Sequence, residues 1–432
     1  MNRPAYAGAA MPGAVPLESG SRRWPPLIPV RQTLPGDAVS DVEGTVVREL
    51  ESIGLGQRVH PGMTVAITAG SRGFPYSVRI LKAMVAEVKR LGGQPFIVPA
   101  MGSHGGATAE GQVEVLRGLG VTEDRLGCPI RSSMDTVLLG RTSDGLPVNA
   151  DKNAMSADAV LLFNRVKLHT DFRGRIESGL TKIMVVGLGK QVGAETCHRA
   201  GLGEALIRLA EVFLAKAPII GGIATVENHR EEPAIIKGLA ANGLIEGEAE
   251  LLRRSVDYLP RLPFDRLDVL IVDRMGKDIS GNGMDTNVIG MHRRIGGAGL
   301  SDIRTIVCLD LTEGGHGNAL GIGLADLVPQ RMAAKVDWAK TYANSITTGF
   351  YGTAKCPIVL PTPEDCVDVA MRPFEPETVR LVRIEDTKHI ETFWVSPALR
   401  QEVGRNDRLT VIGEAGPLAV GGEAESPVIG GD

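Results

Sequence analysis

One lysine of this sequence stands in an unusually apolar run. Its apolar neighbours are Leu180, Ile183, Met184, Val185 and Val186. A surface lysine in such a run can direct its ammonium group to water along its aliphatic stem. A buried lysine without a partner has a lowered pKa instead, and its amine becomes a usable nucleophile near neutral pH. Lys182 is therefore either a snorkelling side chain or an amine able to hold a cofactor covalently.

Three histidines accompany this lysine. His104 lies in the glycine-rich stretch MGSHGG, His169 follows an apolar run, and His198 follows Cys197. Each alone could be a loop residue bonded to the backbone or, for His198, a helix cap. Together they allow a metal centre, because imidazole is the commonest metal ligand, or two bases on either side of a substrate carbon. The spacing favours neither site, although the absence of HxxxH and HExxH pairs argues against a zinc site on one helix.

The elements that must position these groups alternate between strand and helix. We predict strands at 64–68, 95–100, 158–166 and 218–228, and helices at 77–92, 109–120 and 204–217. This alternation implies parallel strands joined by right-handed crossovers. Ligands of such sheets collect at the carboxyl ends of the strands. Arg72, His104 and His169 each follow one of the predicted strands, so we expect them at that edge.

A second block of predicted strands follows Pro260 and Pro263. Its strands are expected at 268–276, 304–311, 378–386 and 408–416, with a helical region at 319–346. We therefore predict an α/β fold of two α/β domains, with mixed or mostly parallel sheets and an active-site cleft between the domains. The expected divisions are a disordered tail at 1–27, an N-terminal cofactor-binding catalytic domain at 28–265, and a C-terminal α/β domain at 266–432 whose last strand could return to the first domain.

Composition narrows the class of partner. The chain has 432 residues, of which 43% are hydrophobic, so it can bury large cores. A net charge of −4 argues against nucleic acid or an anionic membrane as the main partner. The N-terminus lacks the apolar centre of a secretory signal, and five cysteines without a CxxC pair fit a reducing compartment. We expect a cytoplasmic protein that binds a small molecule.

The ordered set of these motifs resembles the nickel-dependent lactate racemase family, whose members are racemases and epimerases that use a nickel-pincer nucleotide. The resemblance extends from about residue 28 to 420 and is closest at 60–200. It is carried by VAITAGSRGFP, VPAMGSHGGATAEGQ, HTDFRGRIESGLTKI and CHRAG, and by ISGNGMDTNVIG, which resembles the family's glycine-rich loop over the substrate. The order and separation of these stretches matter more than any one of them.

The resemblance implies racemisation or epimerisation of a 2-hydroxy acid by reversible hydride transfer to the nickel-pincer nucleotide. Proteins that synthesise this cofactor would then be partners. The implied roles are Lys182 as the covalent thioamide link to the cofactor, Arg72 and Ser71 as further cofactor contacts, His198 as the nickel ligand, His104 and His169 as the acid/base pair, and Arg72, Arg293 and Asn287 as substrate-binding residues.

The sequence departs from the family pattern at several positions. Ala69 stands where the family usually has an acidic residue, three positions before the arginine. Ile289 and Gly290 stand where lactate-type members place a tyrosine and a glutamine, and Arg293 replaces a lysine. These changes remove polar contacts that lactate would use. The basic cluster His292-Arg293-Arg294 could suit a larger or dianionic hydroxy acid, or could be a solvated turn.

Two other functions compete with this expectation. A zinc-dependent hydrolase or lyase would use His104, His169 and His198 as a three-histidine site. A non-catalytic member would bind a hydroxy acid or a nucleotide as a sensor, as Ala69 and the altered substrate loop suggest. Nickel with an adduct on Lys182 would distinguish the racemase from the zinc enzyme, and binding without turnover would indicate the sensor.

Overall fold

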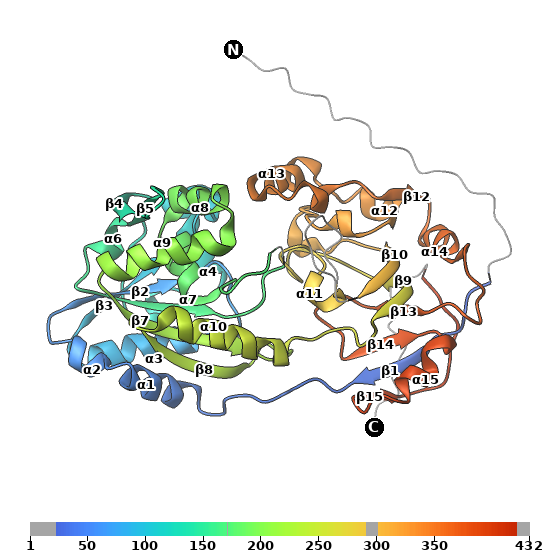
Figure 1. The fold of residues 1–432 in the computed structure, drawn as a ribbon, viewed down its shortest axis with the longest axis horizontal. Coiled ribbons are helices and arrows are strands. Elements are labelled where there is room, and N and C mark those ends of the chain that lie inside the picture. Colours follow the sequence, from blue (N-terminus) through green and yellow to red (C-terminus); the bar gives the residue numbers. More distant parts are fainter. Residues whose placement is uncertain (1–22, 171, 291–300, 421–432) are drawn as a thin grey trace, which may run out of the picture. The chain divides into compact units, whose positions relative to one another are not determined.

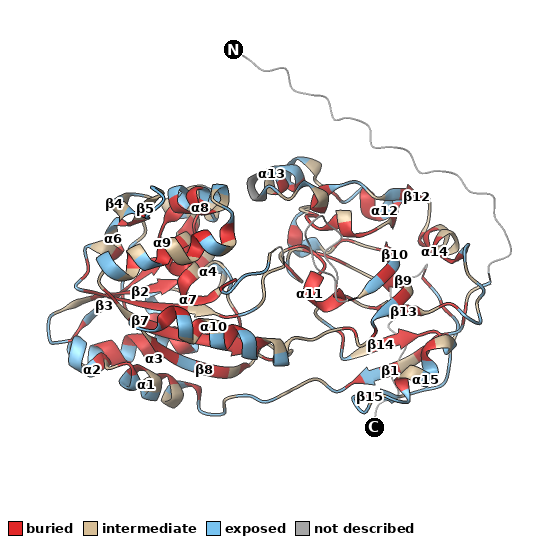
Figure 2. Ribbon diagram, viewed as in Figure 1, coloured by how far each residue is buried: buried red, intermediate tan, exposed pale blue. Residues whose placement is uncertain are grey.

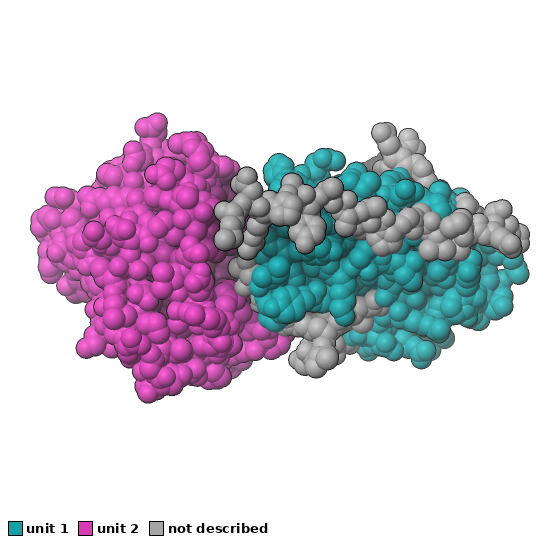
Figure 3. Space-filling model, turned by 90° about the horizontal axis from the view of Figure 1, so that it is seen from above, with its two compact units in different colours: residues 1–34, 260–432 teal, residues 35–259 magenta. Residues whose placement is uncertain are grey.

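The computed structural model describes residues 23–170, 172–290 and 301–420 (Figure 1). It divides into two compact units. Unit 1 comprises residues 1–34 and 260–432, and unit 2 comprises residues 35–259 (Figure 3). The chain therefore leaves unit 1 after its first strand, builds all of unit 2, and then completes unit 1.

Unit 2 is built on a five-stranded sheet with the order β3-β2-β6-β7-β8. The strands are β2 (Thr64–Ala69), β3 (Gln94–Pro99), β6 (Ala159–Arg165), β7 (Ile219–Glu227) and β8 (Pro233–Ala240). The first four strands of that order are parallel, and β8 is antiparallel to β7. Val65, Ala66 and Ile67 of β2 are all fully buried, as expected for a parallel strand covered on both faces.

Helices cover both faces of this sheet (Figure 2). One core contains Ile67 with side chains of α1 (Val42–Ser52) and α3 (Ser77–Arg90), and the other contains Ala66 with side chains of the helices after β6. Neighbouring strand residues point to opposite faces, so a single apolar run supplies both cores. The remaining elements are α2 (Leu55–Arg58), α4 (Ala109–Gly118), α5 (Glu123–Leu126), the hairpin β4 (Thr136–Arg141) and β5 (Pro147–Asp151), α6 (Lys152–Met155), α7 (Gly179–Lys182), α8 (Lys190–Arg199), α9 (Leu202–Lys216) and α10 (Leu244–Ser255).

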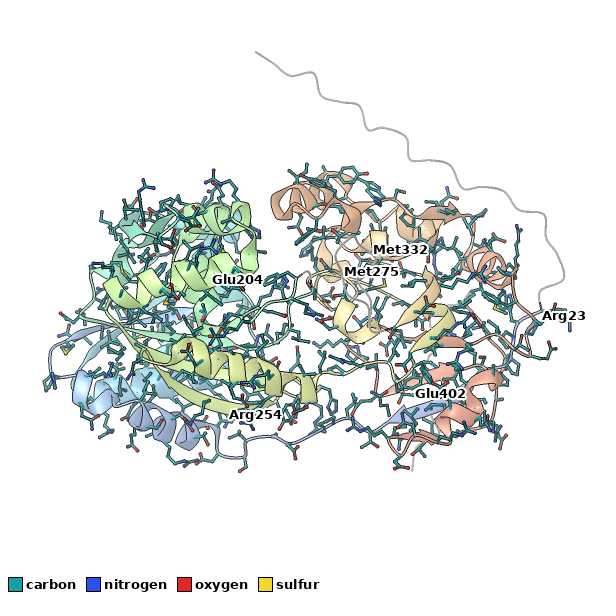
Figure 4. All side chains as sticks on the ribbon, viewed as in Figure 1. Arg23, Glu204, Arg254, Met275, Met332 and Glu402 are labelled. Carbon is teal, nitrogen blue, oxygen red and sulfur yellow. The ribbon has the colours of Figure 1, made fainter. Side chains whose placement is uncertain are left out.

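Unit 1 contains an eight-stranded mixed sheet with the order β12-β11-β10-β9-β13-β14-β1-β15. Its strands are β1 (Ile28–Gln32), β9 (Arg266–Val272), β10 (Asp302–Cys308), β11 (Leu327–Pro329), β12 (Ile358–Leu360), β13 (Leu381–Ile384), β14 (Thr392–Val395) and β15 (Leu409–Val411). The five strands from β12 to β13 are parallel, and the other three run alternately. Met275 and Met332, labelled in Figure 4, are fully buried in the larger of its cores.

The helices of unit 1 are short. They are α11 (Thr286–Ile289), α12 (Gln330–Ala333), α13 (Trp338–Thr348), α14 (Pro363–Met371) and α15 (Arg400–Val403). Helix α14 begins with a capping box, in which Thr362 and Asp365 each bind the other's backbone amide. The predicted α/β class with mixed and parallel sheets is confirmed. No helix within the described residues is both long and apolar enough to cross a bilayer.

Two predicted boundaries need correction. The predicted N-terminal domain of 28–265 includes β1, yet β1 pairs antiparallel with β14 and β15 in the sheet of unit 1. The last strand, β15, completes that same sheet rather than returning to the first domain. The predicted tail of 1–27 also ends too late, because the Trp24 indole donates to Asp368 and Leu27 exchanges backbone hydrogen bonds with Gly416. Residues 1–22 lie outside the described part of the chain.

Candidate active site

Lys182 occupies the end of the short helix α7, and a π-helical turn, Ile183–Gly187, follows directly. Helix α7 starts at Gly179 with a φ of +78°, where a Cβ atom would lie 2.6 Å from the Glu248 carboxyl carbon. Glycine is therefore required at this start. The Thr181 amide donates to Glu248 Oε2 at 2.9 Å, so a buried carboxyl group of α10 holds the first turn. Single π-helical turns are frequent at functional sites.

The Lys182 side chain is half-buried, whereas its neighbours Thr181 and Ile183 are buried. Its Nζ atom lies 5.7 Å from the centroid of the Phe172 ring. An ammonium group near an aromatic face gains a favourable electrostatic interaction with the ring. The amine therefore lies near an aromatic ring, at the end of a half-buried side chain.

His169 lies in the loop after β6, beside the same aromatic ring. The His169 and Phe172 ring centroids are 4.5 Å apart, and the His169 amide donates to Glu177 Oε2 at 2.7 Å. Burial holds the pKa of the imidazole well below its ordinary value of 6.5, and the charge of Lys182 lowers it further. Smaller contributions come from Lys167, His198 and Arg173. The ring is therefore neutral at neutral pH and offers one nitrogen as a proton acceptor.

Glu177 organises the loop that carries His169. Its buried carboxylate accepts hydrogen bonds from the amides of His169 and Gly174 and lies 3.5 Å from the Arg173 guanidinium. Burial raises the Glu177 pKa, and these partners oppose that rise. A buried carboxylate with several donors holds a loop in one conformation. The sequence predicted His169 but gave no sign of this support.

His198 lies half-buried in the last turn of α8, which precedes α9, where Figure 4 labels Glu204. The adjacent Cys197 is fully buried, and burial raises the pKa of its thiol to about 11. A thiol with so high a pKa stays protonated and is a poor metal ligand and nucleophile. At this position the imidazole is therefore the group able to bind a metal ion.

His104 follows β3 and immediately precedes a short 3₁₀ turn, Gly105–Ala107. Its side chain is exposed, whereas its backbone is held by hydrogen bonds to neighbouring residues. Its amide donates to the Met101 carbonyl, and its own carbonyl accepts from Gln112 Nε2 at 3.4 Å. The structure thus places the ring at the carboxyl end of the sheet, as predicted, on a loop with buried anchors.

Arg72 and the half-buried Ser71 follow β2. A pocket inside unit 2 is lined by Gly70, Arg72, Phe74, Asn164 and Arg165, among others. Arg165 is paired with Glu227 at 2.9 Å. The Arg72 side chain reaches solvent, yet the protein packed around it lowers the Arg72 pKa, and Arg165 adds to this effect. An arginine pKa lowered from 12.5 still leaves the Arg72 guanidinium cationic at neutral pH, so Arg72 gives the pocket a group that can bind an anion.

The residues predicted to form the substrate loop belong to unit 1, and Arg293 among them lies outside the described residues. Asn287 is buried in α11, whose first turn is capped by Asp285. Ile289 is fully buried in the core, and Gly290 ends α11 with a φ of +74°. The departures at Ile289 and Gly290 therefore serve packing and helix termination.

A comparison with known protein families identifies the segment that carries most of these residues. Residues 36–206 match the family model of the lactate racemase N-terminal domain. This segment is similar to lactate racemase N-terminal domains. The resemblance recognised in the sequence is thereby confirmed, and the domain contains Ser71, Arg72, His104, His169, Lys182 and His198.

One solved structure similar to this chain is the lactate racemase apoprotein from Thermoanaerobacterium thermosaccharolyticum. The similarity has a TM-score of 0.45 at 14% sequence identity and covers 84% of this chain and 89% of that chain. No curated protein matches the sequence.

The three histidines of the alternative zinc site are not among the clustered metal-binding side chains of the described residues. Throughout the described residues, the only three metal-binding side chains with ligand atoms within 4.8 Å of one another are Glu385, Asp386 and His389 of unit 1. His104, His169 and His198 do not form such a group within the described residues, so the three-histidine zinc site stays a prediction without support from this geometry. The unit 1 cluster is itself an ion-pair network, because Arg274 pairs with both of its carboxylates.

A second lysine of unit 2 was not predicted from the sequence as a site residue. Lys190 is 0% exposed and pairs with Asp151, which is also 0% exposed. Lys182 stands out in the sequence because its neighbours are apolar, whereas Lys190 is followed by the polar Gln191. The preceding Gly187-Leu188-Gly189 was the available signal, because glycines allow backbone segments to approach closely.

Proposed function

We propose that this protein is a racemase or epimerase of a 2-hydroxy acid that uses a nickel-pincer nucleotide attached to Lys182. The observation that carries the proposal is electrostatic. Lys182 and His198 lie close enough to His169 to lower its pKa, and all three belong to the lactate racemase domain. A lysine, a metal-binding imidazole and a neutral base in one neighbourhood are the groups that such a reaction needs.

The residues present fit an anionic nucleotide bound by nickel and by an amine. Lys182, Lys167 and Arg173 all place positive charge near His169, and Glu177 is a buried carboxylate on the same loop. This excess of positive charge favours binding of an anion. His198 would ligate the metal, and Lys182 would carry the covalent link. When bound, the group supplies an electron-poor centre that accepts and returns hydride.

The chain's own residues would move the proton and hold the substrate. Neutral His169 can accept the hydroxyl proton of the substrate at a ring nitrogen. Its lowered pKa makes the resulting imidazolium a ready donor for the return step. His104 would perform the same exchange for the opposite enantiomer. Arg72 would hold the substrate carboxylate through two parallel hydrogen bonds.

The proposal is tested on the full chain co-produced with proteins that synthesise the cofactor. We expect an intact-mass adduct that Lys182→Ala removes, and interconversion of the enantiomers of at least one 2-hydroxy acid by chiral chromatography. In deuterium oxide the product should retain the substrate's own hydrogen at carbon 2. Deuterium at that carbon would contradict hydride transfer, and ligand binding without turnover would indicate the sensor instead.

A further inference from the structure

Lys190 is fully buried at the first position of α8. Its Nζ atom donates to the Pro99 carbonyl at 2.6 Å and to Gln112 Oε1 at 3.0 Å, and lies 3.0 Å from Asp151 Oδ2. Burial lowers the Lys190 pKa and raises that of Asp151, while the attraction between the two charges opposes both shifts. Such a pair is expensive to bury, and removing one partner leaves an uncompensated charge.

The backbone at Lys190 shows that its position is fixed by the surroundings. Its φ of +52° is a left-handed conformation, which is unfavourable for a residue with a side chain. A Cβ atom at the preceding Gly189 would lie 2.2 Å from the Val185 carbonyl. The turn before α8 is therefore tightly packed. It directs the ammonium group of Lys190 to the carbonyl of Pro99, the last residue of β3.

Gln112 connects this buried charge to the loop that carries His104. Its Oε1 accepts from Lys190, and its Nε2 donates to the Gly102 carbonyl at 2.9 Å and to the His104 carbonyl at 3.4 Å. Gln112 is itself 0% exposed. The Gly102 amide also donates to the Gly187 carbonyl at 3.3 Å. Two sets of hydrogen bonds therefore tie the His104 loop to the segment that begins α8.

We propose that Lys190 and Gln112 are positioning residues that hold the His104 loop in register with α8, and so with His198 at the other end of that helix. The proposal rests on the proposed function only for what His104 does. The position of the His104 ring depends on the backbone of its loop, and acid/base transfer needs the reacting atoms placed to within a fraction of an ångström. The buried contacts of Gln112 to the loop carbonyls hold that backbone in place.

Gln112→Met is the sharpest test, because it cuts the link to the loop and leaves Lys190 with Asp151 and Pro99. Hydrogen–deuterium exchange of the apo protein should become about tenfold faster in residues 101–108, the effect of losing one net hydrogen bond. Gln112→Glu keeps the acceptor for Lys190 but loses the donor to the loop, so it should show the same acceleration. Gln191→Met, an exposed glutamine on α8, is the matched control.

In the loaded enzyme, Gln112→Met should lower kcat with KM and the Lys182 adduct retained, as a displaced His104 would. Unchanged exchange of residues 101–108 in both Gln112 variants would overturn the positioning role. Full turnover by His104→Ala would overturn the acid/base role instead, and the exchange result would still decide the positioning role by itself.

Discussion

The imidazole of His169 and the ammonium group of Lys182 share one aromatic neighbour, the ring of Phe172. The ring centroid is 4.5 Å from that of His169 and 5.7 Å from Lys182 Nζ. Two groups that lie 13 positions apart in the sequence thus meet on one side chain of the loop between them. Because the charge of Lys182 contributes to the lowered pKa of His169, a change in that charge should shift the His169 pKa.

Removing the Lys182 charge should raise the His169 pKa in the apo protein. The positive charge of Lys182 is the second largest cause of the lowered pKa, after burial. Lys182→Met removes the repulsion and keeps most of the aliphatic stem. Nuclear magnetic resonance titration of the His169 ring protons would measure the change. Lys152→Met, an exposed lysine paired with Asp135, is the control and should leave the titration unaltered. An unchanged His169 titration in Lys182→Met would show that the two groups are not coupled.

Cofactor retention should separate the site residues into two classes. Lys182→Ala should abolish the mass adduct, and His198→Ala should lower the nickel content per chain, because the first loses the tether and the second loses the ligand. His104→Ala should retain both. Intact-mass measurement and metal analysis on the same samples would check this, and loss of the adduct in His104→Ala would contradict it.

Turnover should respond to His104 far more than to another exposed histidine of unit 2. Loss of a general acid or base typically lowers the rate by about 10²–10⁴-fold. We expect a fall of this order in kcat for His104→Ala and for His169→Ala, with His60→Ala as the control, since His60 is exposed on a turn before β2. Equal rates for His60→Ala and His104→Ala would remove His104 from the mechanism.

Glu248 should make the stability of unit 2 fall with rising pH. Burial raises its pKa from an ordinary 4.5 to about 8, so the folded state holds this proton more tightly than the unfolded state does. Its contribution is fully present below about pH 4.5 and is lost as the pH rises to about 8, at roughly 1.4 kcal/mol for each pH unit of difference in pKa.

Glu248→Gln should remove this pH dependence, because the amide does not titrate. Its oxygen can still accept the hydrogen bond from the Thr181 amide, so the helix start should be retained. Thermal unfolding midpoints across that pH range would measure it. Glu250→Gln, an exposed residue of the same helix that pairs with Arg253, should leave the slope in place. A slope that survives Glu248→Gln would belong to another group.

Gly179→Ala should destabilise the start of α7. The new methyl group would meet the Glu248 carboxyl group at 2.6 Å in a left-handed backbone conformation, which costs about 1–3 kcal/mol. Gly118→Ala is the matched control, because no atom lies within 4 Å of its Cβ position and alanine favours the helix. Thermal unfolding of both variants would measure the difference, and equal midpoints would contradict the strain at Gly179.

The central strands of unit 2 were predictable from the sequence alone. The predicted runs at 64–68, 95–100 and 158–166 differ from β2, β3 and β6 by one residue at either end or less. Strands buried on both faces must be continuously apolar, so they are visible in a single sequence. The hairpin β4–β5 was missed because its first strand is largely exposed and carries mixed residues.

The pairing of β1 was not predictable, because a strand's partners lie far away in the chain. Ile28 and Val30 pair with Val395 and Phe393, more than 360 positions away, and nothing in the local pattern indicates this. The candidate site likewise has residues that the local sequence indicates and contacts that it does not. Loop positions after strands could be inferred, whereas Phe172 beside Lys182 and the buried Lys190–Asp151 pair depend on tertiary packing.

The placement of β1 determines how this chain can be cut. A fragment of residues 28–265 would carry β1 without β14 and β15, leaving unsatisfied amides and the apolar side chains of Ile28 and Val30 free to recruit other molecules. The remainder would lose an inner strand and open its sheet at two edges. Removing residues 35–259 as one fragment breaks the chain at the two places where it passes between the units. Neither sheet is divided by this cut, so both hydrophobic cores stay whole.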